Sequence, residues 1–166
     1  MFGVVILMIL VLLGTQDKPF ARILRAVSKQ IKNGNIKEKV VAQIGHTNYQ
    51  DDKIETFDFT SKEEIENLID KARIIITHAG VGNIIECISK GKKTIVVPRY
   101  KKYKEHTNDH QVQITKEFAS KKYIIPLYNT SNLSNALEKI NEFKPLKYES
   151  NCEKFKNELK KIIDEI

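Results

Sequence analysis

The residues best suited to chemistry in this chain follow a short apolar run, Ile74–Ile76. His78, Gly80, Gly82 and Glu86 all lie in the stretch after that run. The β-branched run predicts a buried strand, and the glycines allow the backbone to turn sharply and to approach a ligand closely. A helix that begins at such a turn directs unpaired N–H groups and its positive dipole end at the strand's edge, where an anion can bind. From these residues alone, an anion site and a helix packed closely on its sheet are both open.

Strands and helices are expected to alternate along the whole chain. Short β-branched runs predict strands at Met8–Leu13, Val40–Ile44, Ile54–Phe59, Ile74–Ile76, Thr94–Val97 and Tyr123–Ile125. Apolar residues at helical spacing predict helices at Phe20–Lys32, from Ser61, after Gly82, and at Asn108–Lys121, Asn132–Ile140 and Glu153–Ile166. This order predicts an α/β fold, a parallel sheet with helices on both faces, as a single domain over the 166 residues.

Two helix starts carry local signals. Ser61, with Glu64 three residues later, forms a capping box. Pro19 suits the first turn of a helix, with Asp17 as a possible cap nearby. At the other end of the chain, residues 150–166 are expected to form an amphipathic C-terminal helix, which either packs on its own domain or docks on a partner.

Four polar loops are expected to meet at one edge of the sheet. They are Gly14–Pro19, Gly45–Tyr49, His78–Gly82 and Arg99–Gln111, and each follows an expected strand. In parallel α/β sheets, ligands bind outside the carboxyl ends of the strands. The chain's polar, glycine and histidine residues are concentrated in these loops. Their convergence indicates a site more strongly than any single loop does.

The composition favours an anionic partner. The chain has a formal net charge of +7 and a pI near 9.3, and 30% of its residues are charged. This balance fits a nucleotide phosphate, an acidic membrane surface or nucleic acid, although a solvated lysine-rich surface explains most of it. Nucleic acid is disfavoured, because no recognised nucleic-acid module accompanies the charge.

No metal site is expected. Cys87 and Cys152 form neither a metal spacing nor a disulfide framework, and they fit free thiols in a reducing compartment. The four histidines are dispersed, and no paired-acid motif of the type that holds a metal is present; the histidines are His46, His78, His106 and His110.

The N-terminal residues 1–7 are interpreted as an extra apolar lead-in to the first strand. The apolar run Met1–Leu13 is shorter than the about 20 residues that span a bilayer. No basic residue precedes it and no small-residue cleavage site follows, which argues against a secretory signal. Two alternatives are open: Met8 is the natural start, or the lead-in rests on a membrane or on a membrane-bound partner.

Several of these blocks together resemble a known family. The chain resembles the C-terminal domain of family 28 glycosyltransferases. The blocks that carry the resemblance are His78–Gly82 with Glu86, Pro98–His106, Asn108–Gln111, and Gly14 with Thr15. Within that family, the chain looks like the small catalytic subunits of split bacterial exopolysaccharide and capsule glycosyltransferases. These resemble the soluble subunit of the two-chain dolichol-linked N-acetylglucosaminyltransferase. The resemblance covers about Met8 to Ile140.

Two positions depart from the family pattern. Asn83 stands where the family usually has Ser or Thr after the second glycine, and an amide can still donate a hydrogen bond to a phosphate. Lys104 stands where related sequences usually have glycine, so the conformation of that loop is open.

The resemblance implies a Rossmann-like domain equivalent to the C-terminal half of a GT-B glycosyltransferase, and it implies a UDP-sugar as substrate, with no cofactor. The turn at Gly80 would then hold the diphosphate, and Glu86 would accept hydrogen bonds from the ribose. The full set of implied substrate-binding residues is Gly14, Thr15, His78, Gly80, Gly82, Asn83, Glu86, Arg99, Asp109 and Gln111.

Several of these roles have a plain structural alternative. His78 either contacts the phosphate or sugar or fixes the turn by hydrogen bonding. Asp109 either recognises sugar hydroxyls with Gln111 or only complements a helix dipole. Thr15 either lines the cleft or is a turn residue. His78 and Thr15 are the only candidates for a catalytic group, and no general base is identified.

The function implied is transfer of a sugar, with inversion, from a UDP-sugar to a polyprenyl-diphosphate-linked saccharide in exopolysaccharide or capsule synthesis. A membrane-anchored second glycosyltransferase subunit would supply the acceptor site and hold this chain, a cytoplasmic protein, on the inner face of the cell membrane. The alternative is a non-catalytic UDP-sugar-binding subunit that enhances a partner. The basic loop Arg99–Lys104 could serve the diphosphate, the acceptor's pyrophosphate or an anionic bilayer.

Overall fold

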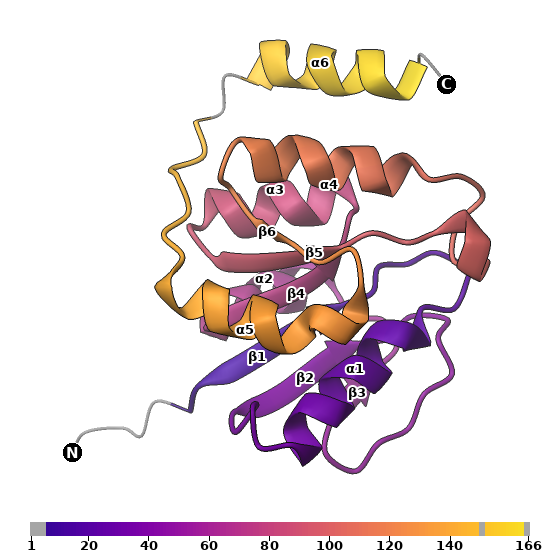
Figure 1. Cartoon of the computed structure of the whole chain (residues 1–166), viewed down its shortest axis with the longest axis vertical. Coiled ribbons are helices and arrows are strands. Elements are labelled where there is room, and N and C mark those ends of the chain that lie inside the picture. The colour runs from indigo at the N-terminus through magenta and orange to yellow at the C-terminus, as the bar shows by residue number, and fades with distance from the viewer. Residues whose placement is uncertain (1–5, 150–151, 165–166) are drawn as a thin grey trace.

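The core of the molecule is a six-stranded sheet in the order β3-β2-β1-β4-β5-β6, with every neighbouring pair parallel (Figure 1). The computed structural model describes residues 6–149 and 152–164. The strands are β1 (Met8–Leu12), β2 (Lys39–Gln43), β3 (Glu55–Phe57), β4 (Ile74–His78), β5 (Lys93–Val97) and β6 (Ile125–Pro126). β1 and β4 are central and consist entirely of buried residues.

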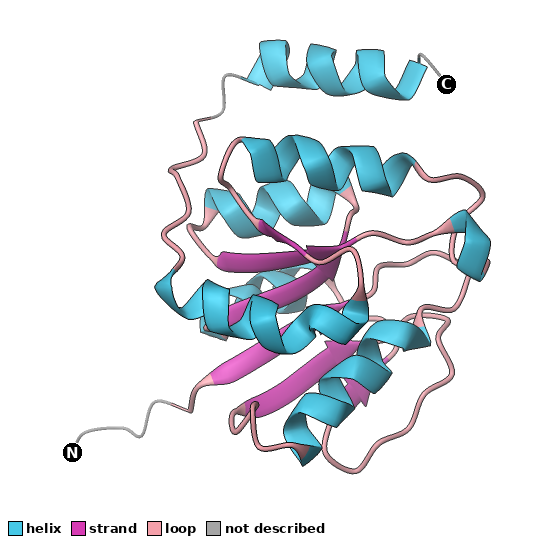
Figure 2. Ribbon diagram, viewed as in Figure 1, coloured by secondary structure: helices cyan, strands magenta, loops and turns pink. Residues whose placement is uncertain are grey.

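Helices cover both faces of the sheet (Figure 2). They are α1 (Ala21–Lys32), α2 (Lys62–Lys71), α3 (Val81–Ser89), α4 (His110–Ser120), α5 (Leu133–Glu142) and α6 (Cys152–Asp164), with short 3-10 turns η1 (Lys101–Tyr103) and η2 (Thr130–Asn132). The fold class predicted from the alternation of elements, with a Rossmann-like strand order, is confirmed.

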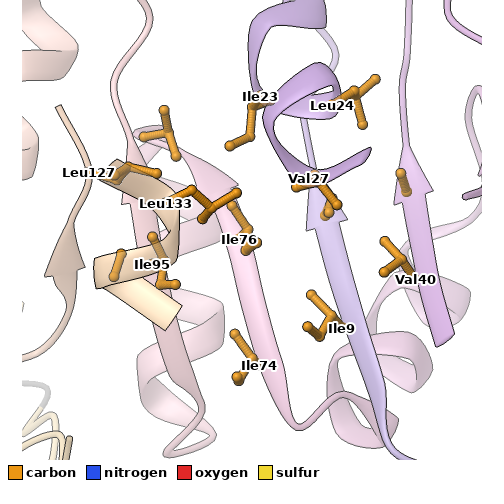
Figure 3. Packing of buried hydrophobic residues seen from close by; sticks show 14 of the residues in the cluster. Ile9, Ile23, Leu24, Val27, Val40, Ile74, Ile76, Ile95, Leu127 and Leu133 are labelled. Carbon is orange, nitrogen blue, oxygen red and sulfur yellow. The ribbon is translucent and has the colours of Figure 1, made fainter. Parts of the chain in front are cut away.

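Alternate residues of β1 serve two different cores. Ile9 and Val11 pack with α1 and α5, in the cluster whose members Ile23, Leu133 and Ile76 are labelled in Figure 3. Leu10 and Leu12 point to the opposite face, where residues of α2 and α3 cover them. Because successive strand residues point to opposite faces, a strand covered on both sides must be apolar throughout, which explains the uninterrupted run from Met8 to Leu13.

The helix ends follow the local signals in one case and not in the other. Ser61 is the N-cap of α2, and its side chain accepts a hydrogen bond from the Glu64 N–H, as the capping-box prediction requires. Asp17 does not cap α1, so that prediction is wrong. The N-cap is Phe20, whose N–H donates instead to the hydroxyl of Thr47, 3.0 Å away, on the loop after β2. A long-range partner has replaced the local one.

The C-terminal helix α6 packs on its own domain. Leu159 is buried in the cluster that α3 and α4 form, and Lys121 at the end of α4 forms an ion pair with Glu158. In Figure 1 α6 lies along α4, as the outermost layer. Of the two alternatives for this helix, packing on its own domain is therefore the one observed. Residues 1–5 of the N-terminal lead-in lie outside the described residues, while Ile6 and Leu7 are exposed.

Candidate functional site

A large pocket lies at the carboxyl ends of β1 and β4. Its volume is about 880 Å³. The chain leaves β1 toward β2 and leaves β4 toward β5, so the loops after these two strands diverge and leave a crevice between them. Seven of the ten sequence-predicted binding residues line it: Gly14, Thr15, His78, Gly80, Gly82, Asn83 and Glu86. A groove of about 650 Å³ between β6 and α5 contains none of the ten.

The turn from β4 into α3 supplies the floor of the pocket. Gly80 is the N-cap of α3 and carries no side chain that could cap the helix. Gly82 and Asn83, in the first turn, both line the pocket. The first N–H groups of a helix have no partner within it, and the helix dipole adds partial positive charge there. The floor is therefore suited to bind an anionic group.

The imidazole of His78 is packed between two glycines. A Cβ atom added to Gly14 would lie 2.4 Å from His78 Nε2, and one added to Gly80 would lie 2.3 Å from His78 Cε1. Side chains at either position would overlap the ring. The two glycines are thus required by the histidine as well as by the turn, a packing reason that the sequence does not reveal.

Amide groups face both ring nitrogens of His78. The Asn83 amide nitrogen lies 3.3 Å from Nε2, and the Gln111 amide nitrogen lies 3.4 Å from Nδ1. Burial, and then the nearby charge of Arg99 and His106, lowers the pKa of His78 from 6.5 to about 3. The ring is therefore neutral at physiological pH.

Two polar atoms of the pocket wall are buried and have no hydrogen-bond partner among the described residues. They are Oε1 of Glu86 and Oε1 of Gln16, and both residues line the pocket. Buried polar atoms are usually paired, so both atoms are available to accept hydrogen bonds from a ligand or an ordered water in the pocket. Gln16 was not identified from the sequence. Its position directly after Gly14 and Thr15, in a loop at the carboxyl end of a strand, was the available signal.

Helix α2 forms the opposite wall of the pocket, which sequence reasoning also missed. Lys62, Ile65 and Glu66 line it, together with Lys90 at the end of α3. α2 follows the third strand and returns over the same sheet face as α3, so its first turns lie near the crevice.

Arg99, which was expected to bind substrate, does not line the pocket, and unlike the lysines of the basic loop it is buried. Its side chain is 1% exposed and donates to the carbonyl oxygens of Leu13 (2.6 Å), Lys18 (2.7 Å) and Glu105 (3.2 Å). The guanidinium also lies over the Phe20 ring. Burial lowers the pKa of Arg99 to about 10, so it stays charged at neutral pH. Arg99 ties together the loops after β1 and β5.

Asp109 and Gln111 do not line the pocket either. The exposed Asp109 accepts a hydrogen bond from the Lys101 N–H, 2.9 Å away, and so holds the η1 turn. Gln111 is 5% exposed, and its amide oxygen accepts from the N–H groups of Ala79 and Arg99. In this structure both side chains accept hydrogen bonds from backbone N–H groups.

The basic loop forms an exposed turn outside the pocket. Lys101, Lys102 and Lys104 are exposed, and the Tyr103 side chain is 52% exposed. Lys104 adopts a left-handed conformation (φ 57°, ψ 26°), which is the geometry that glycine favours. The loop therefore keeps the shape expected of a glycine there, with a lysine in its place.

Within residues 6–149 and 152–164, no group of three or more His, Cys, Asp or Glu side chains is arranged to hold a metal ion. None of the described helices combines the length and the apolar character needed to cross a membrane. Cys87 is fully buried, and burial raises the pKa of its thiol to about 12.

Solved structures with the same fold include glycosyltransferases, ALG13 and a putative UDP-N-acetylglucosamine 2-epimerase of Listeria monocytogenes. The chain superposes on the glycotransferase of kitacinnamycin with a TM-score of 0.63 and 17% identity, covering 82% of this chain and 35% of that one. It superposes on the solution structure of ALG13 with a TM-score of 0.62 and 20% identity, covering 95% of this chain and 97% of that one. These likenesses confirm the predicted fold, one half of a GT-B enzyme.

Curated relatives match part of the chain. The UDP-N-acetylglucosamine transferase subunit ALG13 of Candida albicans is 31% identical over 77 residues, which are 46% of this chain and 25% of that protein. The human protein of the same name is 31% identical over 84 residues, which are 48% of this chain and 7% of the relative.

A family model matches a far larger part of the chain. The model of the glycosyltransferase family 28 C-terminal domain matches residues 8–166, so it begins at the first residue of β1. The resemblance inferred from the blocks around His78 and Pro98 is confirmed. A match over nearly the whole length, on a fold shared with glycosyltransferases, shows that this chain belongs to the glycosyltransferase family 28 C-terminal domain family.

Proposed function

We propose that this chain binds a UDP-sugar in the pocket between β1 and β4 and is the donor-binding, catalytic subunit of a two-chain glycosyltransferase. The observation that carries the proposal is the buried, unpartnered Oε1 of Glu86 beside the open N-terminus of α3. A diphosphate on the helix N-terminus places a ribose one helical turn further along. There the carboxylate can accept hydrogen bonds from its hydroxyl groups.

The same arrangement supports transfer chemistry. When a sugar leaves a nucleoside diphosphate, negative charge develops on the departing phosphate. Unpaired N–H groups fixed at the start of α3 stabilise that charge where it forms. This chemistry requires no cofactor, and the UDP-sugar is the substrate. We propose a hexose as the transferred group and inversion at its anomeric carbon.

A partner subunit supplies the rest of the enzyme in this proposal. An attacking hydroxyl must lose its proton, and a histidine with a pKa near 3 is a poor base. The curated relatives are named as subunits of a UDP-N-acetylglucosamine transferase. The partner would hold a polyprenyl-diphosphate-linked acceptor in exopolysaccharide or capsule synthesis, and would anchor this chain on the cytoplasmic face of the membrane.

The weak basicity of His78 also favours the second candidate function, a non-catalytic UDP-sugar-binding subunit that enhances its partner. Co-expression with the partner separates the two. If chains carrying Glu86→Ala or His78→Ala still support full transfer, the donor site of the reaction lies elsewhere and the catalytic assignment is wrong.

Nucleotide binding to the chain is the direct test. Calorimetric titration with UDP, ADP and NAD should show a clear preference for UDP. Glu86→Gln should weaken UDP binding about tenfold, the effect of losing roughly 1.4 kcal/mol from a charge-assisted hydrogen bond. Glu63→Gln makes the same charge change in the first turn of α2, outside the pocket, and should leave the affinity unchanged. Equal binding of UDP and ADP would contradict the proposal.

A further inference from the structure

The orientation of the Gln111 side-chain amide is fixed by the backbone. Its oxygen lies 3.2 Å from the Ala79 nitrogen and 3.0 Å from the Arg99 nitrogen, and the side chain is buried. A backbone N–H only donates, so the oxygen end of the amide must occupy this position. The NH₂ end is therefore the one that faces Nδ1 of His78, at 3.4 Å. A flipped amide would place its NH₂ group against two other donors.

This orientation determines which ring nitrogen of His78 carries the proton. An amide NH₂ group only donates, so Nδ1 must accept with its lone pair. Burial keeps the ring neutral, and a neutral imidazole has one proton, which is then on Nε2. Gly14 and Gly80 pack closely against the ring, and each ring nitrogen has its own amide neighbour.

The Nε2 side of the ring faces the pocket. His78 lines the pocket together with Asn83, whose side-chain amide lies 3.3 Å from Nε2. The structure has the Asn83 amide nitrogen at this position, so a proton on Nε2 requires the Asn83 amide to be turned over, with its oxygen toward the ring. A ligand oxygen at the start of α3 can take that place.

We propose that Gln111 is a positioning residue that fixes the tautomer of His78, so that Nε2–H serves as a hydrogen-bond donor to an anionic oxygen in the pocket. This rests on the proposed function for the identity of the ligand, a nucleoside diphosphate. Gln111 acts through the histidine, whose Nδ1 its amide faces. With a proton on Nε2 and the Gln111 amide donating to Nδ1, neither ring nitrogen of His78 is free to act as the general base.

The tautomer can be measured without any ligand. Long-range ¹H–¹⁵N NMR of the ring nitrogens distinguishes a protonated nitrogen from a bare one, and His78→Asn assigns the signals among the four histidines. The wild-type chain should show a bare Nδ1 and a protonated Nε2 at neutral pH. A protonated Nδ1 would overturn the proposal.

Gln111→Glu tests whether Gln111 is the cause. The carboxylate can still accept from Ala79 and Arg99, but its second oxygen requires a proton on Nδ1. The ring should therefore become protonated at Nδ1, and UDP affinity should fall at least tenfold. Gln113→Glu makes the same change on the exposed side of α4 and should alter neither the ring signals nor the affinity. An unchanged His78 signal in Gln111→Glu would overturn the proposal.

The two proposals fail in different ways. If UDP does not bind but the tautomer follows residue 111, the positioning role stands and the proposed ligand is wrong. If UDP binds with the expected preference while Nδ1 carries the proton, the proposed function stands and the role of Gln111 is wrong.

Discussion

Two neighbouring segments at the same edge of the sheet use their polar residues in opposite ways. In the segment from His78 to Glu86, polar groups face the pocket and Glu86 Oε1 has no partner in the protein. In the segment from Arg99 to Gln111, buried side chains bind other parts of the chain: the Arg99 guanidinium donates to the Leu13 carbonyl, and the Gln111 amide oxygen accepts from the Ala79 N–H. Both segments are rich in residues suited to ligand binding. The difference shows that hydrogen-bond partners, more than residue type, separate a binding segment from a supporting one.

The largest effect that would test this contrast is expected at Arg99. Arg99→Ala leaves three carbonyl oxygens without their donor and opens a cavity beside Phe20. We expect unfolding free energy to fall by about 3 kcal/mol or more, since each buried unsatisfied acceptor costs roughly 1–3 kcal/mol. Urea denaturation measures this. Lys101→Ala, exposed on the same loop, should change stability by less than about 0.5 kcal/mol. An Arg99→Ala chain of normal stability that fails to bind UDP would instead place Arg99 in the binding segment.

A smaller effect is expected at the glycines of the binding segment. Gly80→Ala adds a methyl group that overlaps the His78 ring, so we expect a loss of roughly 1–3 kcal/mol in stability, the usual range for overpacking. Gly82→Ala is the matched control, because a Cβ there meets no atom within 4 Å and the position is helical. It should raise the stability by about 0.5–1 kcal/mol. Thermal unfolding of the two variants measures both changes in stability. Equal changes for Gly80→Ala and Gly82→Ala would show that the His78 ring can move to accommodate the added methyl group.

The smallest effect is expected at Lys104 in the supporting segment. A left-handed conformation is less favourable for lysine than for glycine, so replacing Lys104 with glycine relieves backbone strain. Glycine loses more conformational entropy on folding, which offsets part of that gain. We expect Lys104→Gly to stabilise the chain by roughly 0.5–1 kcal/mol, as seen by denaturant unfolding. Lys102→Gly, at a position without positive φ, should destabilise it. Loss of stability in Lys104→Gly would mean that the lysine makes contacts that outweigh its backbone strain.

The sequence was most informative where structure depends on near neighbours. Ser61 and Glu64 lie one helical turn apart, so the α2 cap could be predicted from local spacing alone. The uninterrupted apolar runs of β1 and β4 likewise predicted that both strands are buried on both faces. The glycine turn at Gly80 could be assigned to the pocket, because parallel strands end at one edge.

Features that depend on distant residues could not be predicted from the sequence. Arg99 donates to the carbonyl oxygen of Leu13, 86 residues away, and nothing in the loop that contains Arg99 reveals that acceptor. The short strand β6 begins at Ile125, two residues later than expected. It pairs with β5 only at Ile95 and Val96. The predicted strand start, Tyr123, instead packs edge-on against Tyr148 near the C-terminal helix.

The anchoring of Arg99 also has a consequence for how the molecule folds. Its guanidinium joins residues separated by 81 and 86 positions, so these bonds form only after β1 and β5 have both entered the sheet. Contacts between such distant residues carry a high loop-closure entropy and tend to form late. The edge that holds the pocket is thus expected to be the last part of the domain to become ordered. A partially folded chain would have its core before it had any place for a nucleotide.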